Sequence, residues 1–513
     1  MPFLNPSTLE TRVGQMLFAG FEGLEPPDYI LDWLRAGRIG GIILFARNVA
    51  HPAQLAALTN LLQAAAPYGV IISIDQEGGT VARLRQGFTE SPGAMALASA
   101  RDDESLVERV SHMLATELRA LGIHWNYAPV VDISYYADNP SMGTRTFGND
   151  AAKVSRLAVA AVRGFQSGGV AASPKHFPAA GHTAVDTHIA LPALDTPLDH
   201  LLHIDLIPYR AVIAAGAASI MVTHVLYRAL DAEYPSTLSP IVVHRLLRGE
   251  LGYDGLVTTD CLEMQAITQH YGAAESAVLA ALAGIDAILF SHTRSRQEAA
   301  FEALLNAAHS GRLPLRMLDN SNRRLAAFKA TYIQPRTNLS AIRAPEHLAL
   351  VEAAARAATT VLHAGTALPL QGRIGVIEFP SALESGIGEV DGLTGFSHLM
   401  RARLPDAEVL ILKDNQMNAE ATALAARADT LVLAVRNAHL SQEKLDTANQ
   451  LLHTARQAVL VCLRNPHDAA ALTGADTVLC TCGDSAPSLA AAVSALMGDF
   501  VPTGRLPVEV QPV

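Results

Sequence analysis

The chain has 513 residues, of which 50% are hydrophobic and 17% charged, so it is long enough for two domains and too apolar to be disordered. Its formal net charge of -11 provides no basic surface for nucleic acid or anionic lipid. No apolar run reaches membrane-spanning length, and residues 1–6 lack the basic start and apolar run of a secretory signal. The 4 cysteines form no CxxC pair and no metal-binding spacing, as is typical of reduced thiols. We therefore expect a cytoplasmic protein that binds neither nucleic acid nor membranes.

Residues 1–331 alternate short apolar runs with helical patterns, which is typical of parallel βαβ units. Eight strands are predicted, near residues 16–21, 40–45, 70–75, 124–131, 170–175, 219–223, 256–260 and 286–290. Helical patterns between them include residues 52–66, 104–121, 151–166 and 273–283. Most runs are continuously apolar, as expected for strands buried on both faces. Eight such units predict a (β/α)8 TIM barrel.

Polar residues that could do chemistry stand where these apolar runs end. They are Asp75, Asp132, Lys175, His176, His224 and Asp260. In a barrel, the carboxyl ends of all strands open onto one face, where such enzymes keep their active sites. An open sheet would place the same residues along an edge, so the barrel predicts that they converge.

After residue 331 the pattern changes. Residues 332–345 contain prolines and turn formers typical of a linker, and a helix is predicted from residue 346 to about 362. Five further strands are predicted near residues 374–378, 409–412, 430–435, 459–463 and 477–480, forming a smaller open parallel sheet. No phosphate-binding glycine loop follows the first of them, so no nucleotide or other cofactor is expected. We divide the chain into a barrel domain (1–331), a linker with a connecting helix (332–362) and a C-terminal α/β domain (363–513).

Two loops near the barrel strands carry residues suited to binding a sugar. Asp75 ends its strand, and Arg83 follows a tight turn that Gly78 and Gly79 permit. A carboxylate accepts hydrogen bonds from paired hydroxyls, and arginine supplies fixed donors. A salt-bridged loop is the alternative. Arg145 lies in a second loop, between two glycines.

Lys175 and His176 end another strand and precede a loop of small residues that carries Asp186 and His188. In an extended Asp-x-His sequence both side chains lie on the same side, so the carboxylate could accept a hydrogen bond from the imidazole and fix its tautomer. Two polar residues on a surface loop are the alternative.

Asp260 ends the apolar run 256–259 and begins a turn. An aspartate at this place could cap the following helix. It could instead be the carboxylate beneath the anomeric carbon with which a retaining glycosidase forms its covalent intermediate.

Together these motifs resemble glycoside hydrolase family 3, in its β-N-acetylglucosaminidase (β-hexosaminidase) branch, which includes cell-wall recycling enzymes. The similarity runs from about residue 14 to residue 286. It comprises residues 41–48, Asp75-Gln76-Glu77-Gly78-Gly79, Arg145-Thr146-Phe147-Gly148, Lys175-His176-Phe177-Pro178, Asp186-Thr187-His188, residues 221–225 and Thr259-Asp260.

The resemblance implies an exo-acting retaining hydrolase of terminal β-linked N-acetylhexosamine, with a carbohydrate as its small-molecule partner. It implies that Asp260 is the nucleophile, that His188 is the acid/base and that Asp186 is the partner of His188. It further implies that five residues hold the sugar, namely Asp75, Arg83, Arg145, Lys175 and His176. No metal is expected, because the histidines follow no ligand spacing. The natural aglycone and the oligomeric state are left open.

One loop departs from the family pattern, because Ala179-Ala180-Gly181-His182-Thr183 stands where Gly-His-Gly-Asp-Thr is usual. We expect this change to affect the loop, the aglycone preference and the rate, and to leave the catalytic pair in place.

Three alternatives stay open. Phosphorolysis could use the same intermediate, because a neutral base does not repel an incoming anion. A metal-dependent barrel hydrolase could use a cluster of His176, His182, His188, His224 and Asp260. A sugar-binding protein without turnover is the third.

Overall fold

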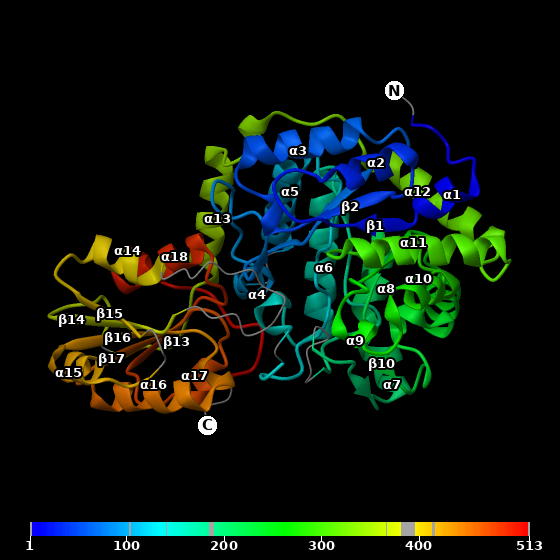
Figure 1. Ribbon diagram of the computed structural model, residues 1–513. Coiled ribbons are helices and arrows are strands. Elements are labelled where there is room, and N and C mark those ends of the chain that lie inside the picture. Colours follow the sequence, from blue (N-terminus) through cyan, green and yellow to red (C-terminus); the bar gives the residue numbers. More distant parts are fainter. Residues whose placement is uncertain are drawn as a thin grey trace.

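A computed structural model describes residues 3–101, 104–139, 141–183, 189–365, 367–380, 395–412 and 416–510. It contains two α/β units, one coloured blue to green and the other yellow to red in Figure 1. Asp186 and His188, the predicted catalytic pair, lie outside the described residues.

Eight parallel strands of the first unit close into a barrel, which confirms the predicted fold class. They are β1 (Leu17–Ala19), β2 (Gly41–Leu44), β3 (Ile71–Ile74), β6 (Trp125–Asn126), β7 (Ala171–Ala172), β9 (Ser219–Val222), β11 (Leu256–Thr259) and β12 (Ile288–Phe290). Six of them pair in the order β12-β1-β2-β3-β6-β7, and β9 pairs with β11. Two parallel bridges, Phe177 to Val222 and Thr258 to Ala287, join the two groups and close the ring. Each strand lies inside one of the eight predicted apolar runs.

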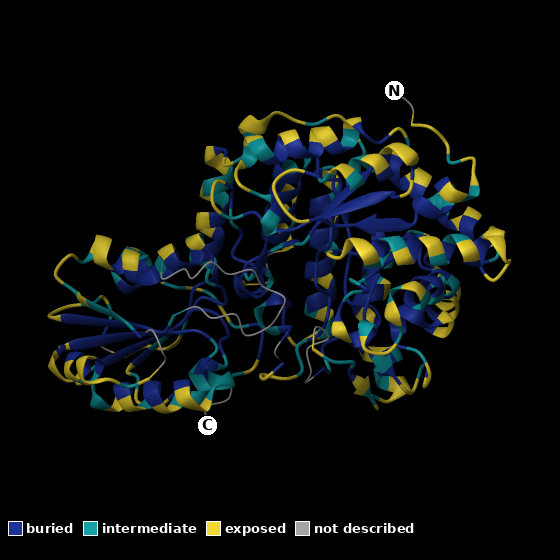
Figure 2. Cartoon of the chain, in the orientation of Figure 1, coloured by how far each residue is buried: buried dark blue, intermediate teal, exposed yellow. Residues whose placement is uncertain are grey.

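Helices surround the barrel, with buried faces toward the strands and exposed faces outward (Figure 2). The main ones are α2 (Asp28–Ala36), α3 (Pro52–Ala64), α5 (Glu104–Ala120), α6 (Ala151–Ser167), α8 (Ile207–Ala214), the π-helix η5 (Ile241–Glu250), α10 (Gly272–Ala283), α11 (Arg294–His309) and α12 (Leu315–Tyr332). Shorter elements are α1 (Leu9–Gly14), η1 (Ala46–Asn48), the β4 (Gln76–Gly78) and β5 (Val81–Ala82) pair, α4 (Ala94–Ser99), η2 (Gly143–Arg145), the β8 (Ala193–Leu194) and β10 (Leu226–Tyr227) pair, α7 (Leu198–His200), the π-helix η3 (Leu201–Asp205), η4 (Ser236–Leu238) and α9 (Gln265–Thr268).

Local chemistry explains how this scaffold is held. Asp150 caps α6 by accepting the backbone N–H of Lys153. Helices α5 and α6 approach closely because Gly164 has no side chain, and a Cβ there would lie 2.3 Å from the carbonyl oxygen of Glu108. Inside the barrel, the buried Trp125 donates its indole N–H to Ser219 Oγ at 2.6 Å. The barrel is therefore a packed core, and its chemistry must be at a mouth.

The second unit is a six-stranded sheet between two helix layers (Figure 1). Its strands are β13 (Thr360–His363), β14 (Ile374–Glu378), β15 (Glu408–Ile411), β16 (Thr430–Val435), β17 (Ala458–Cys462) and β18 (Thr477–Cys480), paired in the order β13-β18-β17-β16-β14-β15. Helices α14 (Gly395–Arg403) and α18 (Ala486–Leu496) cover one face, and α15 (Ala419–Arg427), α16 (Gln442–Thr454) and α17 (Asp468–Ala471) cover the other. Along β16, Leu431 and Leu433 enter one core while Val432 and Ala434 enter the other. Burial on both faces accounts for the continuously apolar run.

One predicted element ends in the wrong place. The helix expected to reach about residue 362 is α13 (Pro345–Ala358), and β13 follows it as an antiparallel edge strand on β18. The alanine-rich helix ends at Ala358, because the β-branched side chains that follow it favour extended backbone. They are Thr359, Thr360 and Val361. The division into residues 1–331, 332–362 and 363–513 stays a prediction, and β13 belongs to the sheet of the last part.

Two short 3-10 helices, η6 (Leu339–Ala341) and η7 (Ala438–Leu440), complete the set of elements. The two units touch along the C-terminal segment of the chain. The backbone N–H of Arg505 donates to the carbonyl of Ser99 at 2.8 Å, and that of Asn149 donates to Pro507 at 3.3 Å. Within the described ranges, no helix is long and apolar enough to span a bilayer.

His124 links two barrel strands through a nitrogen that must stay neutral. The ring is buried, and its Nδ1 accepts the backbone N–H of Ile72 at 3.1 Å. Burial, and then the charge of Arg336, lowers the pKa of His124 from 6.5 to about 3. Between these values the folded chain binds fewer protons than the unfolded chain. The contribution of His124 to stability is therefore complete above about pH 6.5 and is lost as the pH falls toward 3.

We predict that His124→Asn removes this dependence, because the asparagine oxygen replaces Nδ1 as an acceptor and does not titrate. The fall in the free energy of unfolding from pH 6.5 to about pH 5 should be smaller in the variant by about 2 kcal/mol. Calorimetry at both pH values measures it, with the exposed His203→Asn as control. Equal falls in the wild type and in His124→Asn would contradict the assignment.

Candidate active site

A cavity of about 350 Å³ opens at the carboxyl ends of the barrel strands, a volume that suits a small ligand. Six of the eight predicted site residues line it, namely Asp75, Arg83, Arg145, Lys175, His176 and Asp260. They come from chain segments as distant as residues 75 and 260, so the convergence that the barrel predicted is present. The other two predicted residues, Asp186 and His188, lie outside the described residues.

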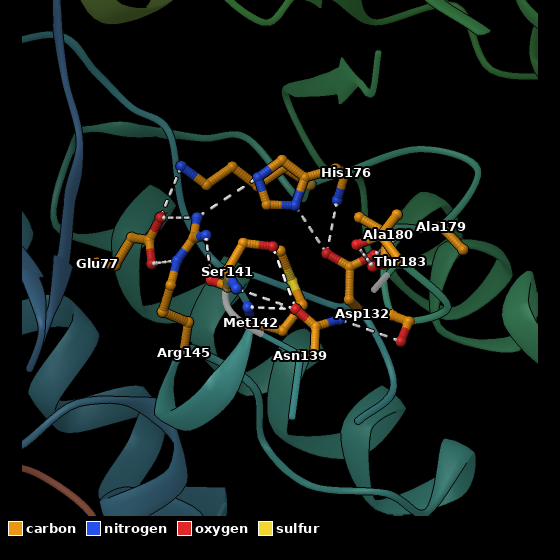
Figure 3. A network of polar contacts seen from close by, with 12 residues as sticks. Glu77, Asp132, Asn139, Ser141, Met142, Arg145, His176, Ala179, Ala180 and Thr183 are labelled. Atoms are coloured by element: carbon orange, nitrogen blue, oxygen red, sulfur yellow. Dashed lines mark hydrogen bonds and ion pairs between the residues drawn. The ribbon is translucent and has the colours of Figure 1, made fainter. Parts of the chain in front are cut away.

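One wall of the cavity is a buried network of charges. Lys175 Nζ lies 2.7 Å from Asp75 Oδ1 and 2.7 Å from Glu77 Oε1. Arg145 meets Glu77 with two parallel hydrogen bonds, Nε to Oε2 at 2.9 Å and Nη2 to Oε1 at 2.8 Å. Figure 3 shows Arg145 between Glu77 and His176. A bidentate pair of this kind fixes the guanidinium in position as well as balancing its charge.

The network favours the ionised forms of Glu77 and Lys175. Burial by itself raises the pKa of Glu77, but the charges of Arg145 and Lys175 outweigh it and hold that pKa well below its usual range. Burial likewise lowers the pKa of Lys175, and the charges of Asp75 and Glu77 reverse the effect and raise it. Lys175 therefore remains a charged donor near neutral pH.

Asp75 and Arg83 meet at the turn that the sequence predicted. Arg83 Nη2 lies 3.6 Å from Asp75 Oδ2, and its guanidinium stands 5.4 Å from the centroid of the Phe45 ring. Gly78 and Gly79 have φ of +89° and +60°, values that suit glycine, and they turn the chain between β4 and β5. Asp75 thus holds one cation on each oxygen, and both cations face the cavity.

His176 is oriented by Asp132, which is buried behind it. Its Nδ1 lies 2.7 Å from Asp132 Oδ2, and its Nε2 lies 3.4 Å from Arg145 Nη2. Because arginine only donates, Nε2 is the acceptor and the ring proton is on Nδ1, pointing at the carboxylate. Asp132 Oδ1 also accepts the backbone N–H of Ala180 at 2.6 Å, so one carboxylate fixes both the ring and the segment that follows it.

Asp260 also lines the cavity and lies directly after β11. Its Oδ1 accepts the backbone N–H of Cys261 at 2.7 Å. The helix-cap alternative is wrong, because the next helix, α9, begins at Gln265 and has Met264 at its N-cap position. The carboxylate is half-buried at the barrel mouth, where a reacting group would be placed.

Two residues of this site were not predicted. Glu77 stands within the Asp75 motif and has the same side-chain type, but its partners Lys175 and Arg145 are distant in sequence. Asp132 was noted as a strand end without a role, and no local pattern links it to His176. Both are positioning residues. Asp132 was already among the predicted strand-end residues and only its role was missed, and extending that search by a few residues beyond each strand would also have found Glu77.

The histidines proposed for a barrel metal site have separate partners. His176 bonds Asp132, His224 Nε2 lies 2.9 Å from the carbonyl oxygen of Cys261, and His182 Nε2 lies 2.9 Å from Asp205. Among the described residues, the His/Cys/Asp/Glu group whose potential ligand atoms lie within 4.8 Å of one another does not include His176, His224 or Asp260, which argues against a metal-dependent hydrolase.

The closed barrel and its charged, strand-end cavity define a (β/α)8-barrel enzyme whose site is built for a polar ligand. Residues 8–328 match the sequence profile of the Glycosyl hydrolase family 3 N terminal domain. The chain therefore belongs to this family and is a glycoside hydrolase, as the sequence motifs predicted.

Individual relatives agree with this placement. The chain is 38% identical over 290 residues to a beta-hexosaminidase of Stenotrophomonas maltophilia (strain K279a), covering 55% of this chain and 85% of the relative. It superimposes with a TM-score of 0.93 and 37% identity on a glycoside hydrolase family 3 beta-N-acetylglucosaminidase from Paenibacillus sp. str. FPU-7, over 99% of this chain and 100% of that one. A beta-glucoside phosphorylase, 21% identical with a TM-score of 0.85 over 98% of this chain and 94% of that one, shares the fold.

We predict that Glu77→Gln lowers kcat/KM by ~10²-fold or more, because loss of the carboxylate charge frees Arg145 and Lys175 to shift by about an ångström. Steady-state kinetics with an aryl β-N-acetylglucosaminide measure it. Glu90→Gln, which breaks the 3.2 Å pair with Arg85, is the matched control and should stay near wild type. Comparable kinetics for both variants would remove Glu77 from the site.

Proposed function

We propose that the chain is a retaining exo-β-N-acetylglucosaminidase in which Asp260 is the nucleophile and His188, oriented by Asp186, is the acid/base. The observation that carries the proposal is the position of Asp260, which faces the same cavity as the charged network of Asp75, Lys175 and Arg145. The substrate class is supported by the two similar proteins, whose names are beta-hexosaminidase and beta-N-acetylglucosaminidase.

The network suits one sugar ring because it offers both kinds of hydrogen-bonding group. Asp75 accepts from hydroxyls, while Lys175, Arg145 and Arg83 donate, and the ion pairs hold each head group in place before substrate arrives. Side chains fixed in advance lose little freedom on binding, so the binding free energy is available for orienting C1 over Asp260.

In the first step, an Asp260 carboxylate oxygen attacks C1 while the bond from C1 to the glycosidic oxygen breaks and His188, as imidazolium, protonates that oxygen. In the second step, neutral His188 takes a proton from water, whose oxygen attacks C1 and displaces Asp260. The two inversions release the sugar with its β configuration. A reference histidine pKa of roughly 6.5 lets one side chain serve in both protonation states near neutral pH.

Phosphorolysis is the second candidate, because a neutral imidazole base admits phosphate in place of water at the second step. We favour hydrolysis because the relatives of 37% and 38% identity carry hydrolase names.

We also propose a cytoplasmic location. All four cysteines, each within the described part of the chain, are free, and three of them are buried. Free thiols are usual in reducing compartments.

We predict that Asp260→Ala abolishes turnover of an aryl β-N-acetylglucosaminide, with a loss larger than the ~10²–10⁴-fold expected from acid–base catalysis alone. In the wild type, a slow fluorinated glycoside with a good leaving group should add the mass of one sugar to the peptide that contains Asp260, measured by mass spectrometry. Asp254→Ala, an exposed change outside the cavity, is the control for folding. Labelling of another residue, or substantial activity in Asp260→Ala, would overturn the assignment.

We predict that His188→Ala lowers kcat by ~10²–10⁴-fold, and that kcat/KM falls less for substrates whose leaving groups need no proton. Added azide should restore turnover and yield the β-glycosyl azide, because it attacks the glycosyl enzyme without a base.

Products of the wild type with and without phosphate separate the two candidates. Free N-acetylglucosamine in both assays supports hydrolysis, whereas sugar 1-phosphate would establish phosphorolysis.

In the azide assay of His188→Ala, a glycosyl azide of inverted configuration would contradict the covalent intermediate.

A further inference from the structure

Three side chains gather beside the loop that departs from the family pattern. His182 follows β7, His200 ends α7 and Asp205 ends η3. His182 Nε2 and His200 Nε2 lie 2.9 Å and 3.8 Å from the same atom, Asp205 Oδ2. The three potential ligand atoms all lie within 4.8 Å of one another. None of the three residues lines the catalytic cavity, so the cluster is separate from it.

Two of the three separations approach those of a tetrahedral transition-metal site. With metal–ligand bonds of about 2.0–2.2 Å, adjacent ligand atoms of a tetrahedral zinc ion lie about 3.3 Å apart. The two separations at Asp205 bracket that value, and each needs a change of about 0.5 Å to reach it. Two imidazole nitrogens and one carboxylate oxygen form a donor set that favours Zn²⁺ over Mg²⁺ or Ca²⁺, which prefer oxygen alone.

The surroundings orient these ligands. Tyr135 donates its hydroxyl to the other oxygen, Asp205 Oδ1, at 2.7 Å, which leaves Oδ2 directed at the two histidines. The Tyr135 ring also stacks on His182, with centroids 4.1 Å apart and 15° between planes. A hydrogen bond to a ligating carboxylate is the support that metal sites usually have.

The three side chains differ in exposure, so that one ligand faces solvent while the carboxylate is buried. The Asp205 side chain is 1% exposed and that of His182 is 10% exposed, whereas that of His200 is 36% exposed. A divalent cation would compensate the buried carboxylate, and the exposed His200 leaves a path from solvent and room for a water as fourth ligand.

We propose that His182, His200 and Asp205 bind one Zn²⁺ ion, which joins the segment after β7 to η3. The sequence did not predict this site, because His182 was named only in the alternative cluster with His176, His188, His224 and Asp260. His182 stands where the family usually has aspartate. The exchange of aspartate for histidine supplies the second imidazole next to Asp205.

The test is a titration of the chelator-treated, full-length protein with Zn²⁺, followed by calorimetry and by metal analysis after dialysis. We expect one Zn²⁺ per chain and a higher melting temperature, because the metal binds the folded state. His200→Gln changes an exposed ligand and should bind at least ~100-fold more weakly, while Tyr135→Phe should bind ~10-fold more weakly through loss of its support.

His203→Gln is the matched control, because His203 is an exposed histidine in the same segment that pairs with Asp199 instead. It should bind Zn²⁺ like the wild type. Co²⁺ in place of Zn²⁺ should give the visible absorption of a four-coordinate ion in the wild type and not in His200→Gln. No binding by the wild type at ~100 µM Zn²⁺, or equal affinity in the wild type and His200→Gln, would overturn the proposal.

Discussion

Four charged side chains lie together at the barrel mouth, each with at most 15% of its side chain exposed. Asp75 and Glu77 supply two negative charges, and Lys175 and Arg145 supply two positive charges. Each of these cations contacts an anion within 3 Å, and Arg83 adds a third cation 3.6 Å from Asp75. Replacing one member would leave an uncompensated charge, which typically costs several kcal/mol. The ligand site therefore depends on the whole set, and the ion pairs hold its donors and acceptors before any ligand binds.

The barrel is what makes such a set possible. Asp75 follows β3, Lys175 follows β7 and Asp260 follows β11, and only a closed ring of parallel strands brings these three ends to one mouth. Strand ends are also the stiffest places from which to hold a side chain, because the backbone on one side is fixed by the sheet. The same rule explains the second layer of the site, since Asp132 follows β6 and reaches across to His176.

The sequence predicted what depends on local pattern and failed where long-range contacts decide. Continuously apolar runs identified all eight barrel strands, because strands buried on both faces need no polar alternation. The boundary at Thr360 was missed, since the pairing of β13 with β18 involves a strand more than a hundred residues away. Glu77 and Asp132 were missed for the same reason. The roles of Glu77 and Asp132 depend on contacts with residues distant in the sequence, and those contacts are known only from the fold. The cap alternative for Asp260 was likewise decided by where α9 begins.

The altered segment after His176 shows which parts of that loop are fixed by packing. Gly181 cannot change, because a Cβ there would lie 2.0 Å from the carbonyl oxygen of Ile133. Ala180 donates its N–H to Asp132, and Asn139 donates its side-chain N–H to the carbonyl of Gly181 at 3.3 Å. These contacts use the backbone, so they hold for alanine as well as for the usual family residues. The substitutions therefore leave the backbone course to the same anchors. The side chain of His182 pairs with Asp205, which joins this segment to η3.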